Sequence, residues 1–417
     1  NQPLAVRGIT LLVGRMLGEA GMHPRFSSLG DPGLSQAARE LWQDWAEICD
    51  QTGTLGLVGV QAQMLHGLYC DGGALLRFWS RGGPVPLTLQ PLELDYLDDL
   101  GLRPNIHGGI EVDSTGRVVA YHLRRQHPLE TAWFAGSTVV DRIPAREIAH
   151  LHTSPRPGAL LGVPVAHAAL SPMRYLDDLG DADLVRLRAQ ATLAAIVMGA
   201  SAPSATATDT PGGFGSVMRN ADGQIVETMT PGSIHYTDAE SVTLTRPQSD
   251  SSLPETVAQW HHLIAVAMGV QYHDLVGDLT AVNYSSYRAG HITDRQNTLV
   301  QREAFIRPRL LHPLWRAWRE AAVAADRRMA ALPSRIDWSA PKWHSVDPSK
   351  DAAADVARIQ AGLNSLSSAI ERSGLDPDEV MASLAADRDK ISELGLTLTT
   401  LLTPASNSAT GNAMEGT

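Results

Sequence analysis

Two helical segments are joined by Gly269-Val270-Gln271-Tyr272-His273-Asp274-Leu275-Val276-Gly277-Asp278-Leu279-Thr280-Ala281-Val282-Asn283-Tyr284-Ser285-Ser286-Tyr287-Arg288-Ala289-Gly290. The segment before this run has helical spacing over residues 254–268 and should end near Gly269, because glycine readily adopts the left-handed conformation of a helix C-terminus. A loop that contains Gly277 should follow, and a very long helix is expected from about Tyr284. The sequence thus predicts a helix, a loop and a second helix in this order.

Two prolines interrupt that second helix. Pro308 and Pro313 each lack a backbone N–H donor and crowd the preceding turn. A kink or a break is therefore expected between Phe305 and Trp315.

A long amphipathic helix is also expected upstream, over residues 171–198. Leu184, Leu187, Ala191, Ala194 and Met198 recur in steps of three or four residues and form one apolar stripe. Such a stripe is typical of an ordinary core helix, and it also fits a helix packed against copies of itself in a ring. Periodicity alone does not separate the two interpretations.

The segment after this helix has the composition of an irregular excursion. Residues 199–215 are rich in Ala, Ser, Thr, Pro and Gly, which disfavours a helix. A hairpin of residues 216–219 and 224–228 should follow, and residues 242–245 should supply another strand.

The two ends of the chain are predicted to form separate folded regions. The N-terminal region carries helical spacing over residues 38–50 and 60–68, and it carries strand signals at 74–79, 87–92, 109–112 and 118–123. This region should be a mixed α+β domain ending near His167. At the other end, apolar residues from Val356 to Ile370 predict one helix that Gly374 terminates, and a second helix should start at Asp376.

The composition indicates a folded chain of two or three domains, with 417 residues of which 43% are hydrophobic and 19% charged. The formal net charge is -11, so no overall basic balance predicts tight DNA binding through phosphate neutralisation. The two cysteines, Cys49 and Cys70, support neither a disulfide framework nor a metal knuckle. No transmembrane helix and no signal peptide are expected.

The sequence shows no motif for catalysis. It has no Gly-rich nucleotide-binding fingerprint and no Gly-x-Ser-x-Gly nucleophile elbow. His150 and His152 could share one face of a strand, but no acidic or thiol partner stands at ligand spacing, so both are expected to be structural. His261 and His262 point in different directions on a helix and are interpreted as interface or surface residues. We therefore expect no enzyme activity, no catalytic residue, no metal and no cofactor.

One acidic cluster keeps an alternative open. Asp177, Asp178, Asp181 and Asp183 lie together on the first long helix, and paired carboxylates can hold magnesium or do acid–base work. A solvated helix face explains the same residues. The alternative function is an intracellular metal-dependent α/β hydrolase that uses this cluster with a histidine.

The run from 269 to 290 resembles the lambda-like family of bacteriophage portal proteins. In that family a Gly-Val, a Leu-x-Gly-Asp and an Asn-Tyr-Ser-Ser-x-Arg-Ala run follow one another, and here the last motif consists of Asn283, Tyr284, Ser285, Ser286, Arg288 and Ala289. Further similarity covers most of the chain, including residues 42–50, 89–95, 109–122, 156–164 and 343–348. One departure is Asp71-Gly72-Gly73, where an acidic residue is expected after the first glycine. Residues 199–223 match no family segment.

The resemblance implies a multi-domain, ring-forming α+β portal fold. The implied divisions are a wing (1–168), a first stem helix (169–198), a clip (199–249), a second stem helix (250–269), a tunnel loop (270–283), a kinked helix that returns to the wing (284–346), a helical crown (347–396) and a disordered tail (397–417). The clip assignment depends only on order along the chain.

The implied function is a dodecameric channel for packaging, retaining and ejecting double-stranded DNA. Its implied partners are further copies of the chain, DNA, the terminase large subunit, a head–tail adaptor, and the major capsid and scaffolding proteins, with no membrane. The implied location is the portal vertex of the virion, after assembly in the host cytoplasm.

The implied channel residues lie in the tunnel loop: Asp274, Leu275, Val276, Gly277, Asp278, Leu279, Thr280, Ala281, Val282 and Asn283. A lining without many Arg contacts lets DNA slide, because each neutralised phosphate adds favourable free energy that movement must break. Asp274 and Asp278 are expected to contribute negative charge to this lining. Arg288 and Arg295 are expected to pair with carboxylates in the subunit interface.

Overall fold

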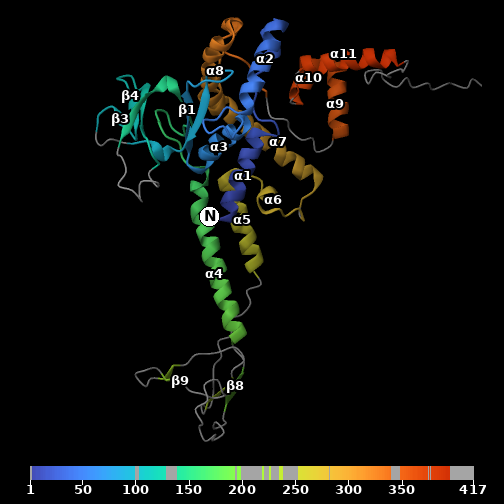
Figure 1. Ribbon diagram of the computed structural model, residues 1–417. Coiled ribbons are helices and arrows are strands. Elements are labelled where there is room, and N and C mark those ends of the chain that lie inside the picture. The colour runs from blue at the N-terminus through green and yellow to red at the C-terminus, as the bar shows by residue number, and fades with distance from the viewer. Residues whose placement is uncertain are drawn as a thin grey trace, which may run out of the picture. The chain divides into compact units, whose positions relative to one another are not determined.

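The structure is a computed structural model that describes residues 2–98, 103–127, 139–192, 195–198, 218–219, 225–226, 234–237, 252–280, 282–339, 348–373, 375 and 377–394. The chain divides into two compact units (Figure 1). Unit 1 contains residues 3–167 and 273–417, and unit 2 contains residues 168–272. No helix in the described ranges combines the length and the apolar character that a bilayer span requires.

Unit 1 begins with three helices, α1 (Pro3–Leu17), α2 (Pro32–Glu47) and α3 (Leu57–Cys70). The Asp31 carboxylate accepts hydrogen bonds from the backbone N–H groups of Gly33 and Leu34, which fixes the start of α2. The predicted helices over 38–50 and 60–68 are confirmed, although both begin earlier than expected. The sequence reasoning missed α1.

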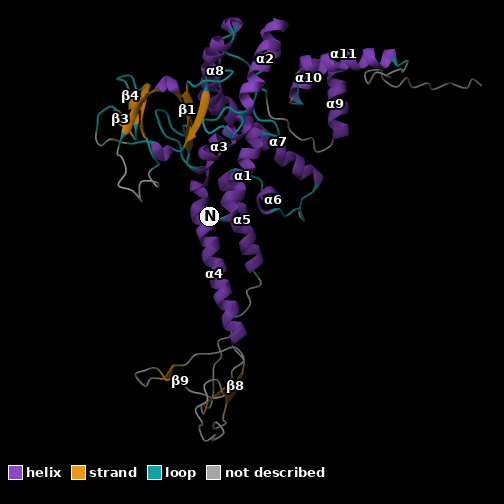
Figure 2. Ribbon diagram, viewed as in Figure 1, coloured by secondary structure: helices purple, strands orange, loops and turns teal. Residues whose placement is uncertain are grey.

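Seven strands of unit 1 form two antiparallel sheets, with orders β2-β1-β7 and β3-β4-β5-β6 (Figure 2). Their bounds are β1 (Gly73–Trp79), β2 (Thr88–Leu92), β3 (Ile106–His107), β4 (Ile110–Val112), β5 (Val118–Arg124), β6 (Val140–Pro144) and β7 (Ile148–His152). The four predicted strands are confirmed as β1, β2, β4 and β5. The sequence reasoning did not predict β3 and β6, and it considered β7 only as a setting for its two histidines.

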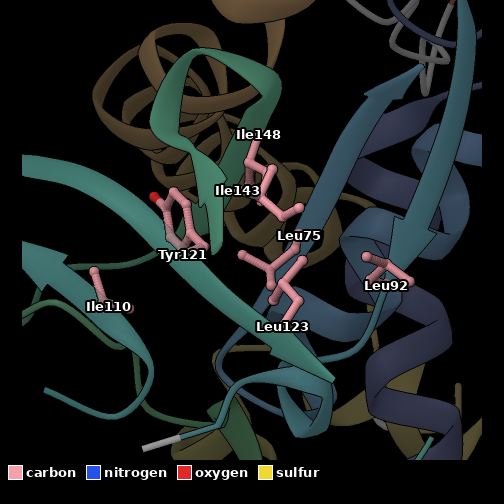
Figure 3. Packing of buried hydrophobic residues seen from close by; sticks show 7 residues of the cluster. All are labelled: Leu75, Leu92, Ile110, Tyr121, Leu123, Ile143 and Ile148. Atoms are coloured by element: carbon pink, nitrogen blue, oxygen red, sulfur yellow. The ribbon is translucent and has the colours of Figure 1, made fainter. Parts of the chain in front are cut away.

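One apolar core joins the two sheets. Figure 3 shows the side chains of Leu75 on β1 and Leu123 on β5 packed beside each other. Alternate residues of a strand point to opposite faces, so Tyr121 and Leu123 reach the same core. The full buried cluster is Leu75, Leu92, Ile110, Tyr121, Leu123, Ile143 and Ile148.

The long C-terminal helix of the sequence prediction changes type near its prolines. It consists of α7 (Tyr284–Gln301), a π-helical segment (Arg302–Leu311) and α8 (His312–Ala325). The N–H of His312 donates to the carbonyl of Arg307, five residues back, and this wider turn accommodates Pro308. The expected irregularity is therefore present, and it begins at Arg302, ahead of the predicted interval.

A tryptophan cluster anchors α8 against α2. Trp315 and Trp318 are 1% and 0% exposed, and the Trp318 ring lies 5.0 Å from the ring of Trp42 in an edge-to-face arrangement. Large aromatic rings supply much buried area and a preferred geometry, so this cluster fixes how the two distant segments pack.

The prediction of a single helix between Val356 and Ile370 is wrong. The structure has α9 (Pro348–Gln360) and α10 (Leu366–Arg372), separated at Gly362, whose φ of +70° is the left-handed conformation that ends a helix. The hydroxyl of Ser365 then accepts a hydrogen bond from the N–H of Ser368 and starts α10. The second predicted helix is confirmed as α11 (Pro377–Glu393). The predicted tail, residues 397–417, lies outside the described residues.

Unit 2 is built on two helices, α4 (Leu170–Thr192) and α5 (Leu253–Met268), which lie side by side (Figure 1). The rings of Tyr175 and Trp260 pack between them, with centroids 5.5 Å apart. As predicted, α5 ends at Gly269, which has a φ of +69°.

The predicted helix over residues 171–198 is too long. Residues 195–198 form a strand, β8 (Ala195–Met198), which pairs in parallel with β11 (Ile234–Thr237). Ile196 and Val197 are β-branched, and such residues favour strands over helices. The predicted hairpin is confirmed over shorter bounds, because β9 (Met218–Arg219) pairs antiparallel with β10 (Ile225–Val226). The strand expected at residues 242–245 lies outside the described residues.

Candidate functional site

The segment between α5 and α7 is more ordered than the predicted tunnel loop. A short helix, α6 (Tyr272–Val276), occupies its first part, and Leu275 is 3% exposed. The prediction of a loop over all of residues 270–283 is therefore wrong for residues 272–276, where burial of the Leu275 side chain favours a packed helical turn. The irregular part begins at Gly277, where φ is +81°.

The remaining loop is stabilised by local polar contacts. The carboxylate of Asp278 accepts hydrogen bonds from the N–H and the hydroxyl of Thr280, at 3.0 and 2.6 Å. Such a turn satisfies the backbone without regular structure. Leu279 is 61% exposed. Ala281 lies outside the described residues.

The family motif performs a structural task at the start of α7. The Asn283 side chain accepts a hydrogen bond from the N–H of Ser286 at 2.9 Å, and the Ser286 hydroxyl accepts one from the N–H of Asn283 at 3.2 Å. This reciprocal pair is a capping box, which satisfies two N–H groups that the first helical turn leaves without partners. Two residues of the motif thus fix where the loop ends.

Asp274 has a different setting from the one expected. Its Oδ2 lies 2.7 Å from Nη2 of Arg15, and the same nitrogen lies 3.0 Å from Oδ2 of Asp294. The side chains of Arg15, Asp274 and Asp294 are 13%, 18% and 6% exposed. The Asp274 carboxylate is therefore mostly buried in an ion pair. The sequence had predicted only that this residue contributes negative charge to the channel lining. Asp278 is half-buried and remains a predicted lining residue.

Three aromatic side chains lie beside this ion pair. The Tyr287 ring is 5.0 Å from the ring of His273 and 4.3 Å from that of His291, measured between centroids. Burial lowers the pKa of His291, which favours the neutral imidazole. Sequence spacing gave no signal for this group, because its histidines belong to two different helices.

A hollow of about 480 Å³ opens next to these residues. It is lined by Arg7, His273, Asp274, Gly277, Leu279, Val282, Asn283, Tyr284 and Tyr287. Six residues of the predicted tunnel loop therefore meet at one place, together with the first residue of α7.

Arg288 pairs with a carboxylate of its own chain. Its guanidinium donates to Asp351 at 3.0 Å and to the hydroxyl of Tyr284 at 3.2 Å. This contact joins α7 to α9 within one chain, and the pairing of Arg288 with a carboxylate in the subunit interface stays a prediction. For Arg295 the interface pairing stays a prediction.

The other histidine candidate is structural. The rings of His150 and His152 on β7 are tilted toward each other with centroids 4.3 Å apart, and burial lowers their pKa values to about 3 and about 4. Both rings should therefore be neutral at physiological pH.

The acidic cluster on α4 does not form a metal site among the described residues. Asp183 forms an ion pair with Arg186 of its own helix. Across the ranges that the structure describes, Asp177, Asp178, Asp181 and Asp183 do not converge with a histidine. No observation of this structure favours the hydrolase alternative.

The comparisons with known proteins agree with the motif at the start of α7. Residues 1–302 match the model of the lambda family of phage portal proteins. The chain belongs to this family. It is a structural family rather than a known enzyme family.

One curated protein and several solved chains are similar to this chain over most of its length. A probable portal protein of Halomonas phage phiHAP-1 is 27% identical over 424 residues, which cover 95% of this chain and 79% of that protein. Two similar solved chains come from the neck of an empty GTA particle, at 16% identity and a TM-score of 0.46, and from the virion of a native gene transfer agent particle, at 15% and 0.45. Each alignment covers 90% of both chains.

Proposed function

We propose that this chain forms a dodecameric portal ring through which double-stranded DNA enters and leaves the capsid of a phage or phage-like particle. The observation that carries the proposal is the match of residues 1–302 to the lambda family of portal proteins. In this role the chain is a virion component at the portal vertex, assembled in the host cytoplasm.

Exposed apolar side chains on α4 support self-association. Leu184, Val185 and Leu187 are 51%, 64% and 47% exposed, and on α5 Val266 is 78% exposed. A folded chain rarely leaves a run of large apolar side chains in water unless another surface covers it. Of the two interpretations of the α4 stripe, the exposure favours packing against copies of the same helix.

The proposed roles of successive segments follow the order of domains in the portal family. Residues 1–168 act as the wing, α4 and α5 as the stem, and residues 199–249 as the clip on which the terminase large subunit and the head–tail adaptor dock. Residues 347–396 act as the crown inside the capsid, where the scaffolding and major capsid proteins surround the ring.

The tunnel loop of this proposal is the segment from Gly277 to Asn283. It follows the partly buried helix α6 and ends at the capping box of α7, so both of its ends are fixed. Its charged side chain is Asp278, and the net charge of the chain is -11. A lining that does not bind phosphates strongly lets the duplex move.

The proposal is tested by the mass of the assembled protein when the α4 stripe is disrupted. Leu184→Arg or Leu187→Arg should shift the protein from rings to smaller species, because a charge at a buried contact is costly. Asp178→Arg places the same side chain at an exposed polar position of α4 and is the matched control. Light scattering after size-exclusion chromatography measures the mass. Rings of unchanged mass in both leucine variants would contradict the stem assignment.

A further inference from the structure

Three metal-ligating side chains meet where α6 faces α7. His273, Asp274 and His291 each present one ligand atom, and these atoms lie within 4.8 Å of one another. Nε2 of His273 and Oδ1 of Asp274 are 3.5 Å apart. Two imidazoles and one carboxylate form a common ligand set of transition metals in proteins.

In both imidazoles Nε2 lacks, among the described residues, the hydrogen bond that a buried ring nitrogen usually makes. The Nε2 atoms of His273 and His291 are shielded from solvent and make no hydrogen bond to any residue in the described ranges. His273 as a whole is only 9% exposed. A buried polar atom without a partner is costly, and each such atom in a folded protein needs an explanation.

We propose that Nε2 of His273, Nε2 of His291 and Oδ1 of Asp274 bind one divalent transition-metal ion of the zinc class. A tetrahedral zinc ion with bonds of about 2.0–2.1 Å holds its ligand atoms about 3.3 Å apart. His273 and Asp274, 3.5 Å apart, are close to this separation, and the His291 ligand atom lies within 4.8 Å of both. The three residues leave a fourth position for water or for a further side chain.

Arg15 and Asp294 complete the surroundings of the ion. Arg15 holds Oδ2 of Asp274, which leaves Oδ1 directed at His273, as an outer-shell partner of a metal ligand commonly does. The positive charge of Arg15 opposes the ion, and the carboxylate of Asp294 offsets it. Arg7 is the second cation, and its Nε donates to the main-chain carbonyl of Asp274 at 3.3 Å.

The ion would connect the two ends of the segment from Gly277 to Asn283. His273 and Asp274 belong to α6 before this segment, and His291 belongs to α7 after it. A shared ion would hold the two helices at a fixed distance and restrict the loop between them. This inference does not depend on ring formation, since all ligands come from one chain.

The test measures Zn²⁺ binding to the full-length, chelator-treated protein by isothermal titration calorimetry. The wild type should bind one ion per chain. His273→Gln and His291→Gln should weaken binding by at least about tenfold, since loss of an outer-shell partner alone typically costs 10–100-fold. Arg7→Gln should strengthen binding, because it removes a positive charge near the ion. His127→Gln removes the imidazole of a second group, with Glu93 and Asp95, and should leave the affinity unchanged.

X-ray absorption at the zinc edge of the wild type makes the test independent of whether the variants fold. Two imidazole nitrogens and oxygen in the first shell are the expected result. Sulfur ligation, a shell of oxygen alone, wild-type affinity in both histidine variants, or no stoichiometric binding by the wild type would each overturn the proposal.

Discussion

Replacement of Arg15 by methionine probes the buried polar contact that links α1 to α6 and α7. The variant keeps the apolar stem of the side chain and removes the guanidinium that lies 2.7 Å from Asp274 and 3.0 Å from Asp294. The carboxylates of Asp274 and Asp294, with side chains 18% and 6% exposed, then lack the guanidinium that lies between them. We expect a clear loss of stability, because an uncompensated buried charge costs more than a lost contact.

The magnitude follows from the burial of the pair. Removal of one partner of a buried ion pair costs about 3–5 kcal/mol, and the partial exposure of Asp274 favours the lower end of this range. A loss of about 3 kcal/mol corresponds to a roughly 100-fold increase in the opening equilibrium. Amide hydrogen exchange should therefore accelerate by about this factor in α1 and α7 if these helices open together.

The matched control is Arg288→Met. Its ion pair with Asp351 has side chains 43% and 38% exposed, so its loss should cost about 0–1 kcal/mol. Asp294→Asn in the Arg15→Met background should recover part of the stability, since it removes one of the two like charges. An exchange rate in Arg15→Met no faster than in Arg288→Met would refute the reasoning.

Three further predictions concern the core, a glycine and the pH dependence of unit 1. Trp318→Ala should cost about 3–5 kcal/mol in denaturant unfolding, because the indole is 0% exposed within the aromatic cluster. Gly72→Ala should destabilise the chain more than Gly158→Ala in thermal unfolding: both glycines have positive φ, but only at residue 72 would a Cβ lie 2.8 Å from backbone atoms. Glu111 has a pKa lowered to about 2, chiefly by its hydrogen bond from Arg142, so its stabilisation is present above the unfolded pKa of about 4.3 and is lost as pH falls toward 2. The difference in melting temperature between wild type and Glu111→Gln should accordingly shrink as the pH falls from about 4.3 toward 2. A difference that stays constant over this pH range would contradict the prediction.

Local sequence signals predicted the elements that depend on local chemistry. Gly269 ends α5, and Asn283 and Ser286 start α7, because each acts on its own helical turn. Pro308 indicated an irregular helix for the same reason, and the structure places a π-helical segment there. The family motif was recognisable because the hydrogen bonds of the capping box join residues that are only three positions apart.

Contacts between distant segments were not predictable in this way. Helical periodicity continued past Thr192, but Ile196 and Val197 pair with a strand almost forty residues later. The ion pair of Arg15 with Asp274 joins residues 259 positions apart, on a helix that the sequence reasoning missed. The group formed by His273, Asp274 and His291 depends on the packing of α6 against α7, which no ligand spacing encodes.

The portal assignment is tested most directly by native mass spectrometry of the purified full-length protein. Twelve copies of the 44.8 kDa chain give about 540 kDa, and negative-stain images of the same sample should show a ring with a central hole that admits a DNA duplex. A monomer or compact dimer that persists at high protein concentration, with no ring in the images, would contradict the account.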